Sequence, residues 1–274
     1  PRSRGRGDVY KRQQSQDLLH ICGTDFYYPA YTDLCKKLQS LSPGKKDWKV
    51  FLSNSGAESV DGAIKLARFH TKREHILAYE GAFHGRTYGA LSLTNSKPVQ
   101  KNGFGPLLPG VFHVPFGLQA EKIVEVIKKS GLELESFAAI FVEPIQGEGG
   151  YIIPQDEFLP QLREVCNEYG ILLVVDEIQS GIGRTGKFFA VEYWDVIPDI
   201  ITLAKGLGSG MPIGAIIGTH EIMSWPPGSH GSTFGGNPVS CAAALATLVL
   251  VENELMENAR KMGAYLLKLS LIHI

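Results

Sequence analysis

Residues 171–186 read ILLVVDEIQSGIGRTG, and this stretch is the strongest indication of the fold class. Its first five residues are all apolar and end directly at the carboxylates of Asp176 and Glu177. An unbroken apolar run of this length is typical of a strand buried on both faces of a parallel sheet. Ligands bind such sheets at the carboxyl ends of the strands. The stretch therefore predicts an α/β protein with a functional site beside Asp176.

The sequence on either side repeats this alternation of short apolar runs and helical patterns. Further strands are expected at 49–52, 75–79, 110–114, 137–142, 200–203 and 214–218, and helices at 57–71, 119–129, 156–169 and from Pro238 past Leu255. This alternation predicts a mostly parallel sheet with helices on both faces. In the helix at 156–169, Asp156 is expected to be the N-cap and Gly170 to end the helix.

The composition of the 274-residue chain excludes several classes of protein. Hydrophobic residues make up 44% of the chain, enough for a sizeable core. The formal net charge of −1 argues against a general nucleic-acid binder. We find no run of about 18 apolar residues, so no membrane span is expected, and no signal peptide is evident. The four cysteines are scattered without metal-ligand spacing, which favours a reducing, cytoplasmic setting and no metal site.

Both ends of the chain are set apart from the rest. Residues 1–12, PRSRGRGDVYKR, and 270–274, SLIHI, resemble read-through of cloning or sequencing adaptors, so both are expected to be non-native tails. A native basic arm is the alternative for the first. Between them we expect an N-terminal segment at 13–48 and a large domain at 49–250, followed by a connecting segment at 251–269.

Three motifs follow predicted strands. Residues 52–58, LSNSGAE, form a strand-to-helix turn of the kind that binds phosphate through backbone N–H groups, although an ordinary capping turn has the same composition. Asp176 ends one buried strand and needs a partner, which would be a protonated ring nitrogen, the N-terminus of a helix that it caps, or a structural ion pair. Lys205 ends another strand, where a lysine forms a Schiff base or simply extends to solvent.

Together these three motifs match one cofactor. Pyridoxal 5′-phosphate needs a helix N-terminus for its phosphate, a carboxylate for its ring nitrogen and a lysine for its aldehyde. The sequence therefore predicts a pyridoxal-phosphate site formed by the turn at 52–58, Asp176 and Lys205.

Longer stretches carry a resemblance to a known family. They are NSGAESVDGAIKLAR (54–68), GAFHGRTYGALSLT (81–94), VEPIQGEGGY (142–151), VVDEIQSGIGRTGKFFA (174–190), ITLAKGLGSGMPIGA (201–215) and HGSTFGGNPVSCAAALA (230–246). In this order they resemble the class III aminotransferases, which are pyridoxal-phosphate enzymes of fold type I. The resemblance implies the large domain of that fold, with most of the small C-terminal domain missing from this chain.

The resemblance also implies a role for each matching residue. Lys205 would bind the cofactor's aldehyde and move the substrate proton, and Asp176 would pair with the ring nitrogen. The remaining cofactor contacts would be Ser55, Gly56 and Ala57 at the phosphate, Phe83 and Ile178 on the two ring faces, Gln179 and Glu143 near the ring hydroxyl, and Thr233 at the phosphate of a neighbouring subunit. His84 would either support the pocket or only pack. The site would therefore need a homodimer.

Two residues bear on the substrate. By the resemblance, Arg86 would bind a substrate carboxylate, with a structural ion pair as the alternative, and Glu148 would pair with an arginine of the C-terminal domain. The implied reaction is ping-pong transamination with 2-oxoglutarate as acceptor and 4-aminobutyrate as the expected donor. Acetylornithine or ornithine aminotransferases and amino-acid racemases or epimerases are the alternatives within the fold, and a non-catalytic binding module is the alternative outside it.

Overall fold

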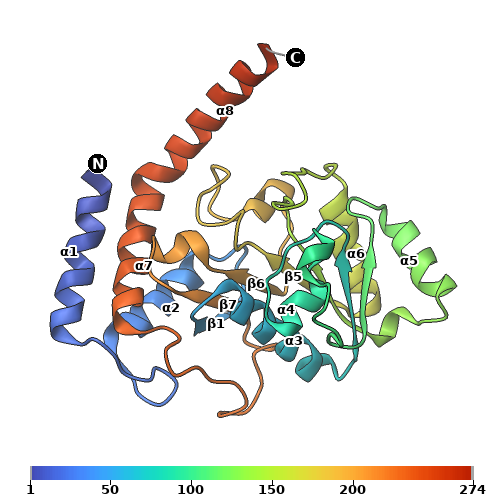
Figure 1. Cartoon of the computed structure of the whole chain (residues 1–274), viewed down its shortest axis with the longest axis horizontal. Coiled ribbons are helices and arrows are strands. Elements are labelled where there is room, and N and C mark those ends of the chain that lie inside the picture. Colours follow the sequence, from blue (N-terminus) through green and yellow to red (C-terminus); the bar gives the residue numbers. More distant parts are fainter. Residues whose placement is uncertain (1, 273–274) are drawn as a thin grey trace.

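The computed structural model describes residues 2–272, and the side chains of residues 9–270. Its centre is a seven-stranded sheet in the order β1-β7-β6-β5-β4-β2-β3 (Figure 1). The strands are β1 (Trp48–Ser53), β2 (His75–Tyr79), β3 (Val111–Val114), β4 (Phe137–Val142), β5 (Leu172–Asp176), β6 (Ile200–Leu203) and β7 (Gly214–Thr219). Every strand expected from the sequence is present, with ends that shift by one residue at most.

The sheet is mostly parallel, as predicted. Strands β3, β2, β4, β5 and β6 pair in parallel, whereas β7 is antiparallel to both of its neighbours, β6 and β1. The carboxyl ends of all strands except β7 therefore lie along one edge. The amino end of β7 reaches the same edge, since Gly214 pairs with Ser53 at the end of β1.

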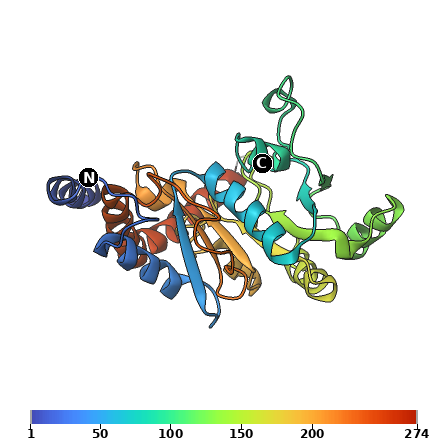
Figure 2. The same cartoon turned by 90° about the horizontal axis from the view of Figure 1, so that it is seen from below.

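Helices cover both faces of the sheet (Figures 1 and 2). They are α1 (Arg2–Asp17), α2 (Pro29–Leu41), α3 (Gly56–Thr71), α4 (Tyr88–Leu93), α5 (Ala120–Lys129), α6 (Phe158–Tyr169), α7 (Pro238–Leu250) and α8 (Met256–Ile272). Leu173 and Val175 of β5 join the core with α2, α5, α6 and α7, while Leu172 and Val174 join the core with α3 and α4. This alternation explains the unbroken apolar run, because both faces of the strand are buried.

The start of α6 differs from the prediction. The N-cap is Glu157 rather than Asp156, and the helix begins at Phe158. Pro160 accounts for the shift, because proline has no N–H and fits only in the first turn, where no intrahelical bond is needed. If Asp156 were the N-cap, Pro160 would lie beyond the first turn, at a position whose N–H should make an intrahelical hydrogen bond. Gly170 ends the helix with φ 62°, as expected.

The long C-terminal helix was expected to begin near Pro238 and to pass Leu255. It does so through a π-helical segment, Val251–Leu255, between α7 and α8. By length and composition, residues 238–270 could cross a membrane, and 56% of the most apolar window is buried inside the protein. Such a helix is weak evidence for a span, because buried core helices share these properties. The absence of a membrane span stays a prediction.

The two ends of the chain are largely helical. Helix α1 lies alongside α7, and α8 extends away from the sheet (Figure 1). Residues 1 and 273–274 lie outside the described residues. The expectation that 1–12 and 270–274 are non-native stays a prediction, as do the domain boundaries.

Candidate active site

A cavity of about 650 Å³ opens at the carboxyl edge of the sheet. Its lining residues come from the loops that follow β1, β2, β4, β5 and β6 and from the loop that precedes β7. They are Asn54, Ser55, Gly56, Ala57, Phe83, His84, Gly85, Arg86, Glu143, Asp176, Ile178, Gln179, Ala204, Lys205, Gly210, Met211, Pro212 and Ile213. Five segments that are far apart in sequence therefore meet where parallel sheets bind ligands.

The N-terminus of α3 forms one wall of the cavity. Ser55 is the N-cap, and its hydroxyl accepts a hydrogen bond from the N–H of Glu58 at 3.3 Å. The Ser55 carbonyl accepts from the N–H of Ser59. Among the described residues, the N–H groups of Gly56 and Ala57 have no acceptor, and both residues line the cavity. Free N–H groups at a helix N-terminus bind phosphate.

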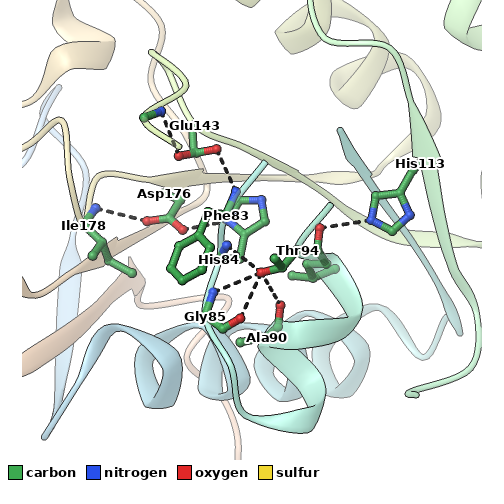
Figure 3. Close-up of polar contacts among 11 residues, drawn as sticks. Phe83, His84, Gly85, Ala90, Thr94, His113, Glu143, Asp176 and Ile178 are labelled. Carbon is green, nitrogen blue, oxygen red and sulfur yellow. Dashed lines mark hydrogen bonds and ion pairs between the residues drawn. The ribbon is translucent and has the colours of Figure 1, made fainter. Parts of the chain in front are cut away.

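Asp176 lies at the end of β5, buried, in contact with His84. The Nδ1 of His84 donates to Oδ2 of Asp176 at 2.7 Å, and the N–H of Ile178 donates to Oδ1 at 3.0 Å (Figure 3). Burial lowers the pKa of His84, but the hydrogen bond and charge of Asp176, with the charge of Glu143, outweigh burial and raise it. The His84 imidazole and the Ile178 N–H therefore hold the Asp176 carboxylate at the wall of the cavity.

Glu143 follows β4 and is also buried. Its carboxylate accepts from the N–H of Phe83 at 3.2 Å and from the N–H of Gly147 at 3.3 Å. Burial raises the pKa of Glu143 to about 7, opposed by the charge of His84. Glu143 thus joins the loops after β2 and β4, and it titrates near neutral pH.

Lys205 follows β6 and lines the cavity. Its side chain is exposed, and it makes no ion pair or hydrogen bond with any described residue. Its φ of 43° lies in the left-handed region, which is uncommon for a residue other than glycine. Strained backbone of this kind clusters at functional sites. The amine is thus presented to the cavity without a competing carboxylate.

Phe83 and Ile178 are among the apolar residues that line the cavity. The guanidinium of Arg86 lies 5.7 Å from the centre of the Phe83 ring and is otherwise exposed. Arg86 makes no ion pair within the described residues, and both roles considered for it stay predictions.

Eleven of the thirteen predicted site residues line this one cavity. Thr233 and Glu148 do not. Thr233 is exposed in the loop before α7, and Glu148 is exposed and pairs with Lys97 at 3.2 Å. The roles predicted for these two residues involve parts outside this chain and stay predictions.

Some features of the site could not be predicted from the sequence. The segment 210–213 reaches the cavity because β7 is antiparallel. The bond between His84 and Asp176 joins residues that are 92 positions apart. A histidine in a glycine-rich turn was the only sequence signal for this bond. No group of three or more His, Cys, Asp or Glu side chains in the described part of the chain could hold a metal ion.

The residues of the cavity fit pyridoxal 5′-phosphate. The unpaired N–H groups of α3 suit a phosphate, and the free amine of Lys205 suits an aldehyde. Asp176 keeps acceptor capacity for a protonated ring nitrogen, because only one donor contacts each of its oxygens. Phe83 and Ile178 offer apolar contacts for a flat ring. Fold and site together define the class of fold type I pyridoxal-phosphate enzymes.

Comparison with known proteins identifies the family. Residues 9–272 match the family model for aminotransferase class-III, and the chain belongs to this family. It is similar to the acetylornithine aminotransferase of Methanopyrus kandleri, with 47% identity over 92% of this chain and 63% of that protein. It is also similar to the probable 4-aminobutyrate aminotransferase of Bacillus subtilis, with 38% identity over 92% of this chain and 62% of that protein.

Solved structures share the fold. The ornithine aminotransferase of Toxoplasma gondii, described with partial occupancy of pyridoxal phosphate at its active site, superposes with a TM-score of 0.86. It is 34% identical over 95% of this chain and 62% of that chain. The present chain thus spans somewhat less than two thirds of its relatives. Class III aminotransferases are pyridoxal-phosphate-dependent enzymes, so the predicted family, fold class and cofactor are confirmed.

Proposed function

We propose that the whole protein transfers an amino group from an ω-amino acid to 2-oxoglutarate by a ping-pong mechanism, with pyridoxal phosphate in the cavity. One observation carries the proposal. The unpaired amine of Lys205 lines the same cavity as the buried Asp176–His84 pair and the free N–H groups of α3. Family membership supports the reaction class.

Each residue then has a distinct task. The bound cofactor supplies an electron sink that stabilises negative charge on the substrate carbon. Asp176 stabilises positive charge on the ring nitrogen, and His84 donates to Asp176 to fix its orientation. Lys205 would hold the cofactor through its aldehyde. With a substrate amine bound there instead, the Nζ of Lys205 would be free to accept a proton from the substrate carbon.

The donor is proposed at the level of a chemical class. Both relatives are named for donors that join a primary amine to a carboxylate through a flexible chain. Arg86 offers an exposed guanidinium without a carboxylate partner at the cavity, and such a group suits a substrate carboxylate. 4-Aminobutyrate, the donor expected from the sequence, and N-acetylornithine both satisfy this chemistry.

A donor screen on the full-length protein tests the proposal. Glutamate formed from 2-oxoglutarate is measured with 4-aminobutyrate, N-acetylornithine, ornithine and a diamine as donors. We expect one carboxylate-bearing donor to dominate and Arg86→Ala to raise its KM about tenfold or more while leaving the KM of the diamine unchanged. Inversion of a single amino acid without glutamate would instead establish a racemase.

We further propose a homodimer with shared sites. Thr233 is exposed and lies outside the cavity of its own chain, so contact with a cofactor phosphate needs a second copy. The measurement is the mass of the full-length protein in solution, together with the cofactor affinity of Thr233→Ala. A monomer that binds pyridoxal phosphate with full affinity would contradict this part of the proposal.

A further inference from the structure

The turn after β2 has an unusual set of hydrogen bonds. The N–H groups of Phe83, His84 and Gly85 all donate to side-chain oxygens and not to other backbone groups (Figure 3). Glu143 accepts from Phe83, and the hydroxyl of Thr94 accepts from the other two, at 2.9 and 3.2 Å. Two side chains therefore hold the turn at residues 83–86, all four of which line the cavity.

Every hydrogen-bonding position of the Thr94 hydroxyl has a partner. A hydroxyl has two acceptor sites and one proton to donate. The acceptor sites take the N–H groups of His84 and Gly85, and the proton is within reach of the Gly85 carbonyl at 2.9 Å and the Ala90 carbonyl at 3.2 Å. Thr94 is fully buried at the end of α4, so water cannot replace the hydroxyl. Its loss would leave buried backbone groups without partners.

The backbone of the turn at Gly85 is both uncommon in conformation and tightly packed. Its φ of 138° is a conformation that other residues rarely adopt. A Cβ there would lie 2.8 Å from the Cβ of Ala57 and 2.9 Å from the Cβ of Ala90. The turn is thus packed directly against the first turn of α3, where the free N–H groups face the cavity. Any shift of the turn moves Phe83 and His84 relative to Asp176 and to α3.

We infer that Thr94 is a positioning residue of the active site. Its hydroxyl fixes the turn that places Phe83 against the cavity and His84 against Asp176, although Thr94 itself does not line the cavity. The inference rests on the proposed function in one respect, namely that the cavity takes pyridoxal phosphate. A cofactor-independent consequence is slow exchange of the His84 and Gly85 amide protons.

Three variants of the full-length protein test this role. Thr94→Val keeps the shape and removes the hydroxyl, Thr94→Ser keeps the hydroxyl, and Thr247→Val is the matched control. Thr247 is also buried, but in the described part of the chain its hydroxyl bonds only to the Ala243 carbonyl of its own helix. The readouts are amide hydrogen exchange of residues 83–86 without cofactor and the Kd for pyridoxal phosphate.

We expect Thr94→Val to speed amide exchange at His84 and Gly85 and to raise the Kd about tenfold or more. Thr94→Ser should restore both, and Thr247→Val should change neither. Where Thr94→Val does not fold, Thr94→Cys retains a weaker acceptor and should give intermediate losses.

Two results would overturn the inference. One is unchanged exchange at His84 and Gly85 in Thr94→Val, and the other is a Kd equal to that of the wild type despite faster exchange. Failure of the proposed function looks different, because the wild-type protein itself would then not bind pyridoxal phosphate. The exchange measurement remains informative in that case, since it uses the cofactor-free protein.

Discussion

The two edges of the sheet each hold a carboxylate beside β5, but the two carboxylates have different surroundings. At the amino edge, Asp199 accepts from Nη1 of Arg163 at 2.7 Å and from the N–H of Leu173 at 2.8 Å. At the carboxyl edge, Asp176 pairs with His84, whose Nε2 has no partner among the described residues, and Lys205 has none either. The amino edge thus gives its carboxylate a cation partner, whereas the carboxyl edge leaves polar groups free for a ligand.

The strongest test of this contrast removes the free amine. Lys205→Ala should abolish covalent retention of pyridoxal phosphate after borohydride reduction, because no other nucleophile replaces the lysine. The melting temperature of the cofactor-free protein should stay unchanged, since the Lys205 side chain makes no hydrogen bond or ion pair with any residue that the structure describes. Mass spectrometry and thermal denaturation measure the two effects. Lys129→Ala, at an exposed lysine of α5, is the control. Covalent retention in Lys205→Ala would contradict the assignment.

The second test compares the same substitution at the two edges. Asp176→Asn should lower kcat/KM of the full-length enzyme by about 10²–10³-fold, because a neutral amide cannot stabilise charge on the ring nitrogen. It should also lower the pKa of His84, which the bond and charge of Asp176 keep raised against burial. Steady-state kinetics and NMR titration of His84 are the measurements.

Asp199→Asn is the matched control for Asp176→Asn. It should lower stability through the lost ion pair with Arg163 and leave kcat/KM of the folded enzyme unchanged. Equal kinetic losses in the two variants would remove the distinction between the edges.

The sequence reveals the functional edge better than it reveals the contacts made there. The apolar runs at 137–142 and 171–175 located strands β4 and β5, because burial on both faces leaves an unmistakable pattern. Asp176 and Lys205 were found because they directly follow such runs. Thr94 and the segment 210–213 were not, since their roles depend on a tight turn and on the antiparallel direction of β7. Spacing along the chain does not encode contacts of this kind.

A third prediction concerns Glu177, which lies at the functional edge but outside the cavity. Its carboxylate accepts from Ser180 at 2.5 Å and from the N–H of Val191 at 2.8 Å, so it holds the loop after β5. Burial raises the pKa of Glu177 to about 7. Because the folded state then binds the proton more tightly than the unfolded state, its contribution to stability falls as pH rises from about 4.5 to about 7, by roughly 3 kcal/mol.

Glu177→Gln should remove this pH dependence. We expect the variant to gain stability relative to the wild type at pH 8 and to show no such gain at pH 4.5, as measured by denaturant unfolding at both values. Glu164→Gln, at an exposed glutamate of α6, should follow the wild type at both. A variant that is less stable than the wild type at pH 8 would show that the charged form of Glu177 is favoured by its hydrogen bonds.

The smallest expected effect belongs to the structural edge. Arg163→Met keeps the aliphatic contacts of the side chain but leaves Asp199 with the Leu173 N–H and the more distant Lys46, at 3.9 Å. The side chains of Arg163 and Asp199 are 17% and 15% exposed, so partial screening limits the loss to about 2 kcal/mol. Combining Arg163→Met with Asp199→Asn in a double-mutant cycle isolates the pair. A coupling near zero would mean that the backbone bond to Leu173, and not the ion pair, fixes Asp199. The contrast would then lie in the free groups at the carboxyl edge and not in stronger pairing at the amino edge.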